Sequence, residues 1–137
     1  CKACPLLRYY ALPRERLQDC YEAKQGLVDL CQQAGKKNSL VRIACRELES
    51  WYLADLQAAQ TGLQTPGLIR YQEKRTYRNP DVLQAPAKQL QKIAPIYQKI
   101  SGSRAIGPHL DPDNTRSNSF AVFVSGIREI VNQLKQS

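Results

Sequence analysis

The clearest pattern in the chain is a stripe of apolar residues near its C-terminal end. Apolar side chains there recur every three or four positions, which is the spacing of one helix face. Ser117 or Ser119 stands where a serine hydroxyl can cap the first turn of a helix. The pattern predicts a long C-terminal helix whose stripe packs against the rest of the protein, with a seam for a partner helix as the alternative. The stripe consists of Phe120, Phe123, Val124, Ile127, Ile130, Val131 and Leu134.

Other segments carry helical signals as well. Residues 15–34 have apolar positions at helical spacing, and Gly35 is placed to end that helix. Residues 47–60 have a second apolar stripe, with two glutamates in the expected first turn, where the helix dipole favours negative charge. Shorter helices are expected at 87–93 and near 104–110. These patterns predict a mostly helical protein.

A compact run rich in β-branched residues, Leu40 to Cys45, predicts a strand. Residues 6–12 are ambiguous and are a possible second short strand. A strand, helix and strand in this order favour a right-handed parallel crossover, so the predicted fold class is α/β with a minimal parallel sheet. Two strands are too few for a stable open sheet. Either residues upstream complete the sheet, or helices cluster around a minimal one.

The remaining segments bear on domain organisation. Residues 1–137 suit a single domain, and 1–12 form a poorly defined N-terminal segment. Residues 62–86 are expected to be an extended basic connector, because proline and glycine interrupt a segment that is rich in arginine. A connector of this length is usually functional or lies along the surface. Its tyrosines, Tyr71 and Tyr77, are candidates for stacking on the bases of a nucleic acid.

Composition narrows the class of function. Twenty Lys and Arg against twelve Asp and Glu give a net charge of +8, which favours a polyanion such as nucleic acid, or an acidic partner. The chain contains no apolar run long enough to cross a bilayer and no secretory signal, so a cytoplasmic location is expected. Five cysteines at irregular spacing are a poor disulfide framework and suit a reducing compartment. Because the chain has no initiator Met, we expect the natural protein to begin upstream.

The densest polar group follows the expected strand. Glu47 and Glu49 lie at its C-terminal end, beside Arg46, where α/β proteins often place their sites. Carboxylates gathered there are able to bind Mg²⁺ together with substrate phosphates. The alternative is that they stabilise the helix N-terminus and that Arg46 pairs with Glu49 on the surface. The sequence leaves both interpretations open.

A second candidate is the loop around His109, which is the only histidine. Arg104 and Arg116 flank it, and an arginine-rich loop before a helix N-terminus is able to hold phosphate. A capping or surface role for His109 is the alternative. The chain contains no nucleotide-binding glycine loop and no zinc-protease or serine-hydrolase motif.

The stretch from Leu40 to Asp55, LVRIACRELESWYLAD, resembles an uncharacterised bacterial family, domain of unknown function 4276. The resemblance covers roughly residues 20–134. It continues through Asn79-Pro80-Asp81, Tyr97-Gln98-Lys99, the run from Ser103 to Asp111, and Arg116-Ser117-Asn118-Ser119-Phe120.

The resemblance implies a Toprim-like α/β domain encoded beside an ATPase partner in bacterial genome defence. It implies Mg²⁺-dependent phosphoryl transfer on nucleic acid, through an upstream glutamate and an Asp-x-Asp pair. The corresponding stretch here, residues 7–16, contains no Asp, and the glutamate-bearing first strand is absent. The resemblance therefore implies a truncated domain with an incomplete catalytic site. The residues that carry over are Glu47 and Glu49 as acidic site residues, and His109, Arg104 and Arg116 as phosphate contacts. The candidate catalytic residues are thus Glu47, Glu49 and His109, and the candidate phosphate contacts also include Arg46.

Two functions from different classes follow. The first is a Toprim-like protein that acts on nucleic acid with an ATPase partner; its full-length relatives would be metal-dependent, nuclease-like enzymes. The second is a non-enzymatic basic module that binds nucleic acid or a partner protein, with salt-sensitive binding and no turnover. The sequence specifies neither a substrate nor an oligomeric state.

Overall fold

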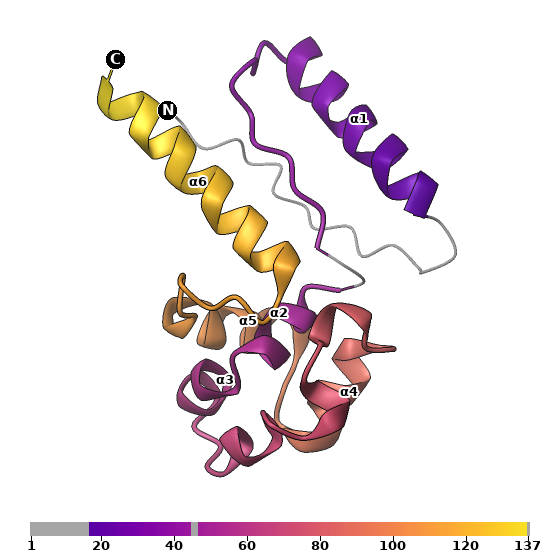
Figure 1. The fold of residues 1–137 in the computed structure, drawn as a ribbon, viewed down its shortest axis with the longest axis vertical. Coiled ribbons are helices and arrows are strands. Elements are labelled where there is room, and N and C mark those ends of the chain that lie inside the picture. The colour runs from indigo at the N-terminus through magenta and orange to yellow at the C-terminus, as the bar shows by residue number, and fades with distance from the viewer. Residues whose placement is uncertain (1–16, 45–46, 137) are drawn as a thin grey trace.

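The computed structural model describes residues 17–44 and 47–136, and these residues are predominantly helical (Figure 1). None of the helices in this part of the chain is both long and apolar enough to span a membrane. The elements, in chain order, are α1 (Leu17–Gln33), α2 (Glu49–Ala54), α3 (Leu56–Leu63), the 3-10 helices η1 (Leu68–Tyr71), η2 (Arg75–Tyr77) and η3 (Pro80–Val82), α4 (Pro86–Ile93), α5 (Lys99–Ile106), the 3-10 helix η4 (Gly107–His109) and α6 (Asn118–Gln136).

The predicted long C-terminal helix is confirmed as α6, and the helix expected at 15–34 is confirmed as α1 over its described residues. Ser117 supplies the cap of α6, because its hydroxyl accepts a hydrogen bond from the Phe120 amide at 3.2 Å. The short helix expected at 87–93 is α4. The helical turn expected near 104–110 begins earlier, as α5, and ends in η4.

The predicted parallel sheet is wrong for the described residues, which contain no strand. Residues 40–44 have no regular secondary structure, although they are rich in β-branched side chains. A strand needs a neighbour for its backbone hydrogen bonds, and no extended segment pairs with this one in the described structure. Local propensity therefore does not produce an α/β fold here. The possible strand at 6–12 and residue Cys45 lie outside the described ranges.

The single helix expected at 47–60 is instead two helices that meet at Asp55. The backbone of Asp55 leaves the helical region, with φ −133° and ψ 73°, and its side chain accepts a hydrogen bond from the Ala58 amide at 3.0 Å. The side chain of Gln72 joins the two helices: it accepts from the Leu56 amide at 2.8 Å and donates to the Leu53 carbonyl at 3.0 Å. The break thus leaves these two backbone groups hydrogen-bonded.

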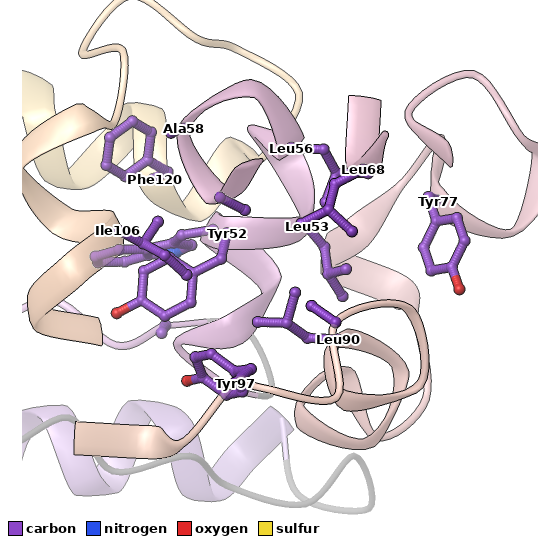
Figure 2. Close-up of a cluster of buried hydrophobic side chains, with 14 residues drawn as sticks. Tyr52, Leu53, Leu56, Ala58, Leu68, Tyr77, Leu90, Tyr97, Ile106 and Phe120 are labelled. Carbon is purple, nitrogen blue, oxygen red and sulfur yellow. The ribbon is translucent and has the colours of Figure 1, made fainter. Parts of the chain in front are cut away.

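The core lies between α2, α3, α4 and α5, and α2 is buried along its whole length. Figure 2 shows its side chains converging from these helices and from the 3-10 segments. Tyr97 fits into it because Gly102 in α5 has no side chain: a Cβ there would overlap the Tyr97 ring. Gly62 likewise allows α3 to approach the backbone of α5. The largest fully buried hydrophobic side chains are Tyr97, Leu53, Leu56, Leu68, Leu90 and Ile106.

The helices α1 and α6 project from this body, with residues 34–44 running between them in the view of Figure 1. The first turns of α6 pack onto the body through Phe120, and Phe123 stacks on Trp51 at 5.0 Å between ring centroids. Farther along, the predicted core stripe is only partly buried: Ile127, Val131 and Leu134 are 40 to 49% exposed. Core packing of the stripe is therefore confirmed for its N-terminal part alone.

Candidate functional site

Glu47, predicted as a metal ligand, is a cap for another helix. Its Oε2 accepts a hydrogen bond from the Ala87 amide at 2.7 Å, in the first turn of α4. The N-cap residue of α4 is Ala85, whose side chain has no acceptor. A carboxylate from elsewhere in the chain therefore satisfies one of the free amides of that helix end and also suits its dipole.

Glu49, the second predicted ligand, lies inside the protein, and its side chain meets Tyr97 in the segment between α4 and α5. It is 5% exposed, and its Oε1 accepts a hydrogen bond from the Tyr97 hydroxyl at 2.9 Å. Burial raises the pKa of the Tyr97 hydroxyl far above its usual value; the hydrogen bond with Ser103 opposes that rise, and the Glu49 charge adds to it. Tyr97 therefore stays protonated and donates to Glu49 across the neutral pH range.

Asp55 is a third internal carboxylate. One oxygen caps α3 through the Ala58 amide, and the other accepts a hydrogen bond from the Asp111 amide at 2.9 Å. Asn114 adds a further link, because its side-chain amide donates to the Ala54 carbonyl at 3.0 Å. Asp55 therefore ties the loop after η4 to the junction between α2 and α3.

Asp81 accepts hydrogen bonds at the N-terminal end of α6, a role that the sequence pattern did not predict. Its Oδ1 accepts from the Ser117 hydroxyl at 2.6 Å, and its Oδ2 accepts from the Ser119 amide at 3.1 Å. Trp51 completes the cluster by donating from its indole nitrogen to the Ser119 hydroxyl at 2.8 Å. The signal was present in Asn79-Pro80-Asp81 and Ser117-Asn118-Ser119, but nothing in the sequence showed that the two motifs meet.

The predicted site residues are therefore dispersed. Glu47 hydrogen-bonds to α4, and Glu49 to Tyr97 in the segment between α4 and α5; Arg104 is exposed on α5, and His109 is exposed on η4. Arg46 lies outside the described residues. Within 17–44 and 47–136, no group of three or more His, Cys, Asp or Glu side chains is placed so that it could hold a metal ion. Binding of Mg²⁺ by Glu47 and Glu49 stays a prediction, and the hydrogen bonds described above lend it no support.

The segment expected to be an extended basic connector contains the 3-10 helices η1, η2 and η3 instead. Three buried side chains anchor its first part to the core: Leu68, Gln72 and Tyr77. The cations of residues 68–78 are all exposed. Together with Arg116 they form what we call the basic surface, which comprises Arg70, Lys74, Arg75, Arg78 and Arg116.

Contacts within the segment hold several of these cations in place. The Arg70 guanidinium and the Lys74 ammonium lie over the Tyr71 ring, at 5.1 and 4.5 Å from its centroid. The hydrogen bond and the charge of Arg70 lower the pKa of Tyr71; burial opposes this shift, and the charge of Lys74 adds to it. Glu73 contacts two further cations. Its carboxylate pairs with Arg116 at 3.0 Å, and its backbone carbonyl accepts a hydrogen bond from Arg78 at 3.3 Å.

The tyrosines that were candidates for base stacking are not free to stack. Tyr77 is 5% exposed and belongs to the core. Tyr71 is half-buried, meets Tyr77 edge to face at 6.1 Å between centroids, and carries the two cations over its ring. In this segment the Tyr71 ring holds Arg70 and Lys74, and Tyr77 packs in the core.

Charge is divided unequally between the interior and the surface. In residues 47–136 all eleven Lys and Arg are exposed, whereas only four of the eight Asp and Glu are. The other four are the capping and buried carboxylates described above, whose charge is partly balanced by the amides and hydroxyls that donate to them. The solvent-facing surface is therefore more basic than the composition indicates. The exposed acidic residues are Glu73, Asp111, Asp113 and Glu129.

Comparison with known proteins identifies a family. Residues 5–128 match a family model described as a domain of unknown function, DUF4276. Neither the curated proteins nor the solved structures include a significant match. Because the match spans most of the chain, the protein belongs to the DUF4276 family.

Proposed function

We propose that this protein binds nucleic acid electrostatically through its basic surface, as a module that need not catalyse a reaction. The observation that carries the proposal is the placement of charge: every cation of residues 47–136 faces solvent, while half of the carboxylates are used internally. Anchoring by Leu68, Gln72 and Tyr77 supports it further, because cations on a fixed segment lose less conformational freedom on binding.

The phosphate-contact role predicted for Arg116 fits this surface, although its pairing with Glu73 competes with a phosphate. The carbon stems of these arginines and lysines keep their charged groups in water, where phosphates reach them without a desolvated pocket. The Mg²⁺-dependent phosphoryl transfer and the ATPase partner that the sequence resemblance implies stay predictions, and the structural contacts described above favour neither.

The proposal is tested by fluorescence anisotropy with a labelled DNA duplex. A surface that contacts several phosphates releases counterions, so affinity falls about tenfold or more between about 50 mM and about 200 mM salt. Reversal of one cation, Arg75→Glu, should weaken binding by about tenfold at the lower salt concentration. Lys135→Glu makes a similar change in net charge near the end of α6, away from the basic surface (Figure 1), and should weaken binding by less than about twofold.

Two results would contradict the proposal. One is duplex affinity that does not change with salt. The other is equal weakening by Arg75→Glu and Lys135→Glu, because binding would then follow net charge alone. A nicking assay with Mg²⁺ separates the two function classes: turnover that is lost in Glu47→Gln or Glu49→Gln would establish the enzymatic hypothesis instead.

A further inference from the structure

The aromatic side chains bear on which kind of nucleic acid the basic surface takes. Proteins that bind single strands without sequence preference combine a basic groove with exposed rings on which the bases stack. In residues 47–136 no Phe, Tyr or Trp side chain is exposed. Trp51, Tyr52, Tyr77, Tyr97 and Phe120 are 5% exposed or less, and Tyr71 and Phe123 are half-buried against other rings.

Tyr71 is the ring nearest to the cations, and its own contacts oppose stacking on a base. Arg70 and Lys74 lie over the ring, and Arg70 also donates to the Tyr71 hydroxyl at 3.3 Å. A base would have to displace these cations from the ring, which would weaken the phosphate contacts that attract the nucleic acid. Both cations are exposed while they contact the ring, so their charges are accessible to phosphates.

Charge density favours the duplex over the open strand. Two strands present one phosphate charge per about 1.7 Å of helix axis, and neutralising them releases more counterions per contact than a single strand does. A duplex also holds its phosphates in a regular array, so cations that are already positioned gain the most from it. The buried side chains of Leu68, Gln72 and Tyr77 attach the segment to the core, which restricts how far its cations can move and suits a regular array.

Resting on the proposed function, we propose that the basic surface binds the phosphate backbone of double-stranded nucleic acid and reads neither unpaired bases nor sequence. The exposed aromatic side chain that the structure describes elsewhere, Tyr21, is 74% exposed on α1. In Figure 1 this helix lies apart from the body that carries the basic surface. Tyr21 therefore does not supply a stacking ring next to these cations.

The experiment compares a duplex of mixed sequence with an oligothymidylate strand of the same length, in wild type and in two variants. Tyr71→Leu removes the ring, and Tyr71→Phe, the matched control, keeps it. Because both substitutions can alter how Arg70 and Lys74 are held, the quantity of interest is the ratio of the two affinities within each protein. Thermal unfolding by circular dichroism verifies that each variant is folded.

We expect the duplex to bind at least about threefold more tightly than the strand, with a ratio that changes less than about twofold in either variant. A strand that binds more tightly than the duplex, with that preference lost in Tyr71→Leu by about fivefold or more and kept in Tyr71→Phe, would show stacking and overturn this inference. That result would leave the proposed function standing. Failure of both nucleic acids to bind would overturn the proposed function itself.

Discussion

The internal carboxylates and the basic surface use charge in opposite ways. Glu47, Glu49, Asp55 and Asp81 each accept hydrogen bonds from groups on other elements and hold the helices together. The arginines and lysines of residues 68–78 are exposed to solvent, on a segment that is attached to the core by buried side chains. The difference follows from side-chain chemistry: a carboxylate is a compact acceptor for free amides at a helix end, whereas a long cationic side chain keeps its charge hydrated.

Glu47 and Glu49 have a different role in the fold from the one that their sequence position indicates. In the sequence, Glu47 and Glu49 stand out as candidate ligands because they follow a β-branched run. In the structure, the groups that donate to them account for their position without a cation. These acidic residues therefore stabilise the fold through hydrogen bonds, and the exposed basic residues are the better candidates for binding a partner.

The largest effect on stability is expected for Asp55→Ala. Two amides, those of Ala58 and Asp111, lose their acceptor at a site that is only 7% exposed. The free energy of unfolding should fall by about 2–3 kcal/mol. Urea denaturation measures the change. Asp113→Ala is the control, because Asp113 is exposed and pairs only at the surface, with Arg128, so it should cost less than about 0.5 kcal/mol. Equal costs would contradict the structural role of Asp55.

Gln72→Ala tests whether the basic surface depends on its anchors. The Leu56 amide and the Leu53 carbonyl would lose their buried partner, so we expect a loss of about 2 kcal/mol in the free energy of unfolding. Nucleic-acid affinity should also fall, by about twofold to threefold, because cations on a more flexible segment lose more conformational entropy on binding. The control is Gln57→Ala on the exposed face of α3. Unchanged affinity would show that the anchors do not matter for binding.

Glu47→Ala separates a capping role from a metal role. The first turn of α4 would lose an acceptor for the Ala87 amide, and the free energy of unfolding should fall by about 1 kcal/mol. Unfolding is measured with and without Mg²⁺, and we expect the same difference in both. If Mg²⁺ stabilised the wild type but not the variant, Glu47 would be a metal ligand.

The smallest effect is expected for Glu73→Gln, which should raise duplex affinity, whereas Gln72→Ala should lower it. Glu73 is the acidic residue within the segment that carries the basic surface, and its carboxylate pairs with Arg116. Removing that charge frees Arg116 and takes away a repulsive group, so duplex affinity should rise by about twofold. Glu129→Gln on α6 serves as the control with the same change of charge. A rise for Glu129→Gln alone would place the binding surface elsewhere.

The elements that follow local rules were predictable from the sequence. The apolar periodicity of α1 and α6 and the serine cap of α6 depend on neighbouring residues only. The absence of a sheet was not, because a strand is stabilised by a partner that no local pattern specifies, and residues 40–44 have no such partner in the described structure. The break at Asp55 was also missed: it depends on Gln72, and nothing in the helical pattern of 47–60 indicates a contact with a residue beyond it.

In the candidate site, too, features set by the local sequence could be predicted, and features set by distant contacts could not. The sequence alone predicts that the chain is basic and that residues 62–86 contain four of its twenty Lys and Arg, namely Arg70, Lys74, Arg75 and Arg78. The state of Tyr71 and Tyr77 could not be predicted, because stacking tyrosines and core tyrosines have the same sequence signal in a basic segment. The meeting of Asp81 with Ser117 and Ser119 joins residues 36 and 38 positions apart, which only the folded chain reveals.

The central claim, that the partner is bound by the cations and not at the carboxylates, is tested most directly by hydrogen–deuterium exchange with a bound duplex. Mass spectrometry follows the amides with and without DNA, in the presence of Mg²⁺. We predict slower exchange in peptides that cover 68–78 and Arg116, and no change toward the C-terminal end of α6. Slower exchange confined to the peptides around Glu47 and Glu49, with none in 68–78, would contradict the account.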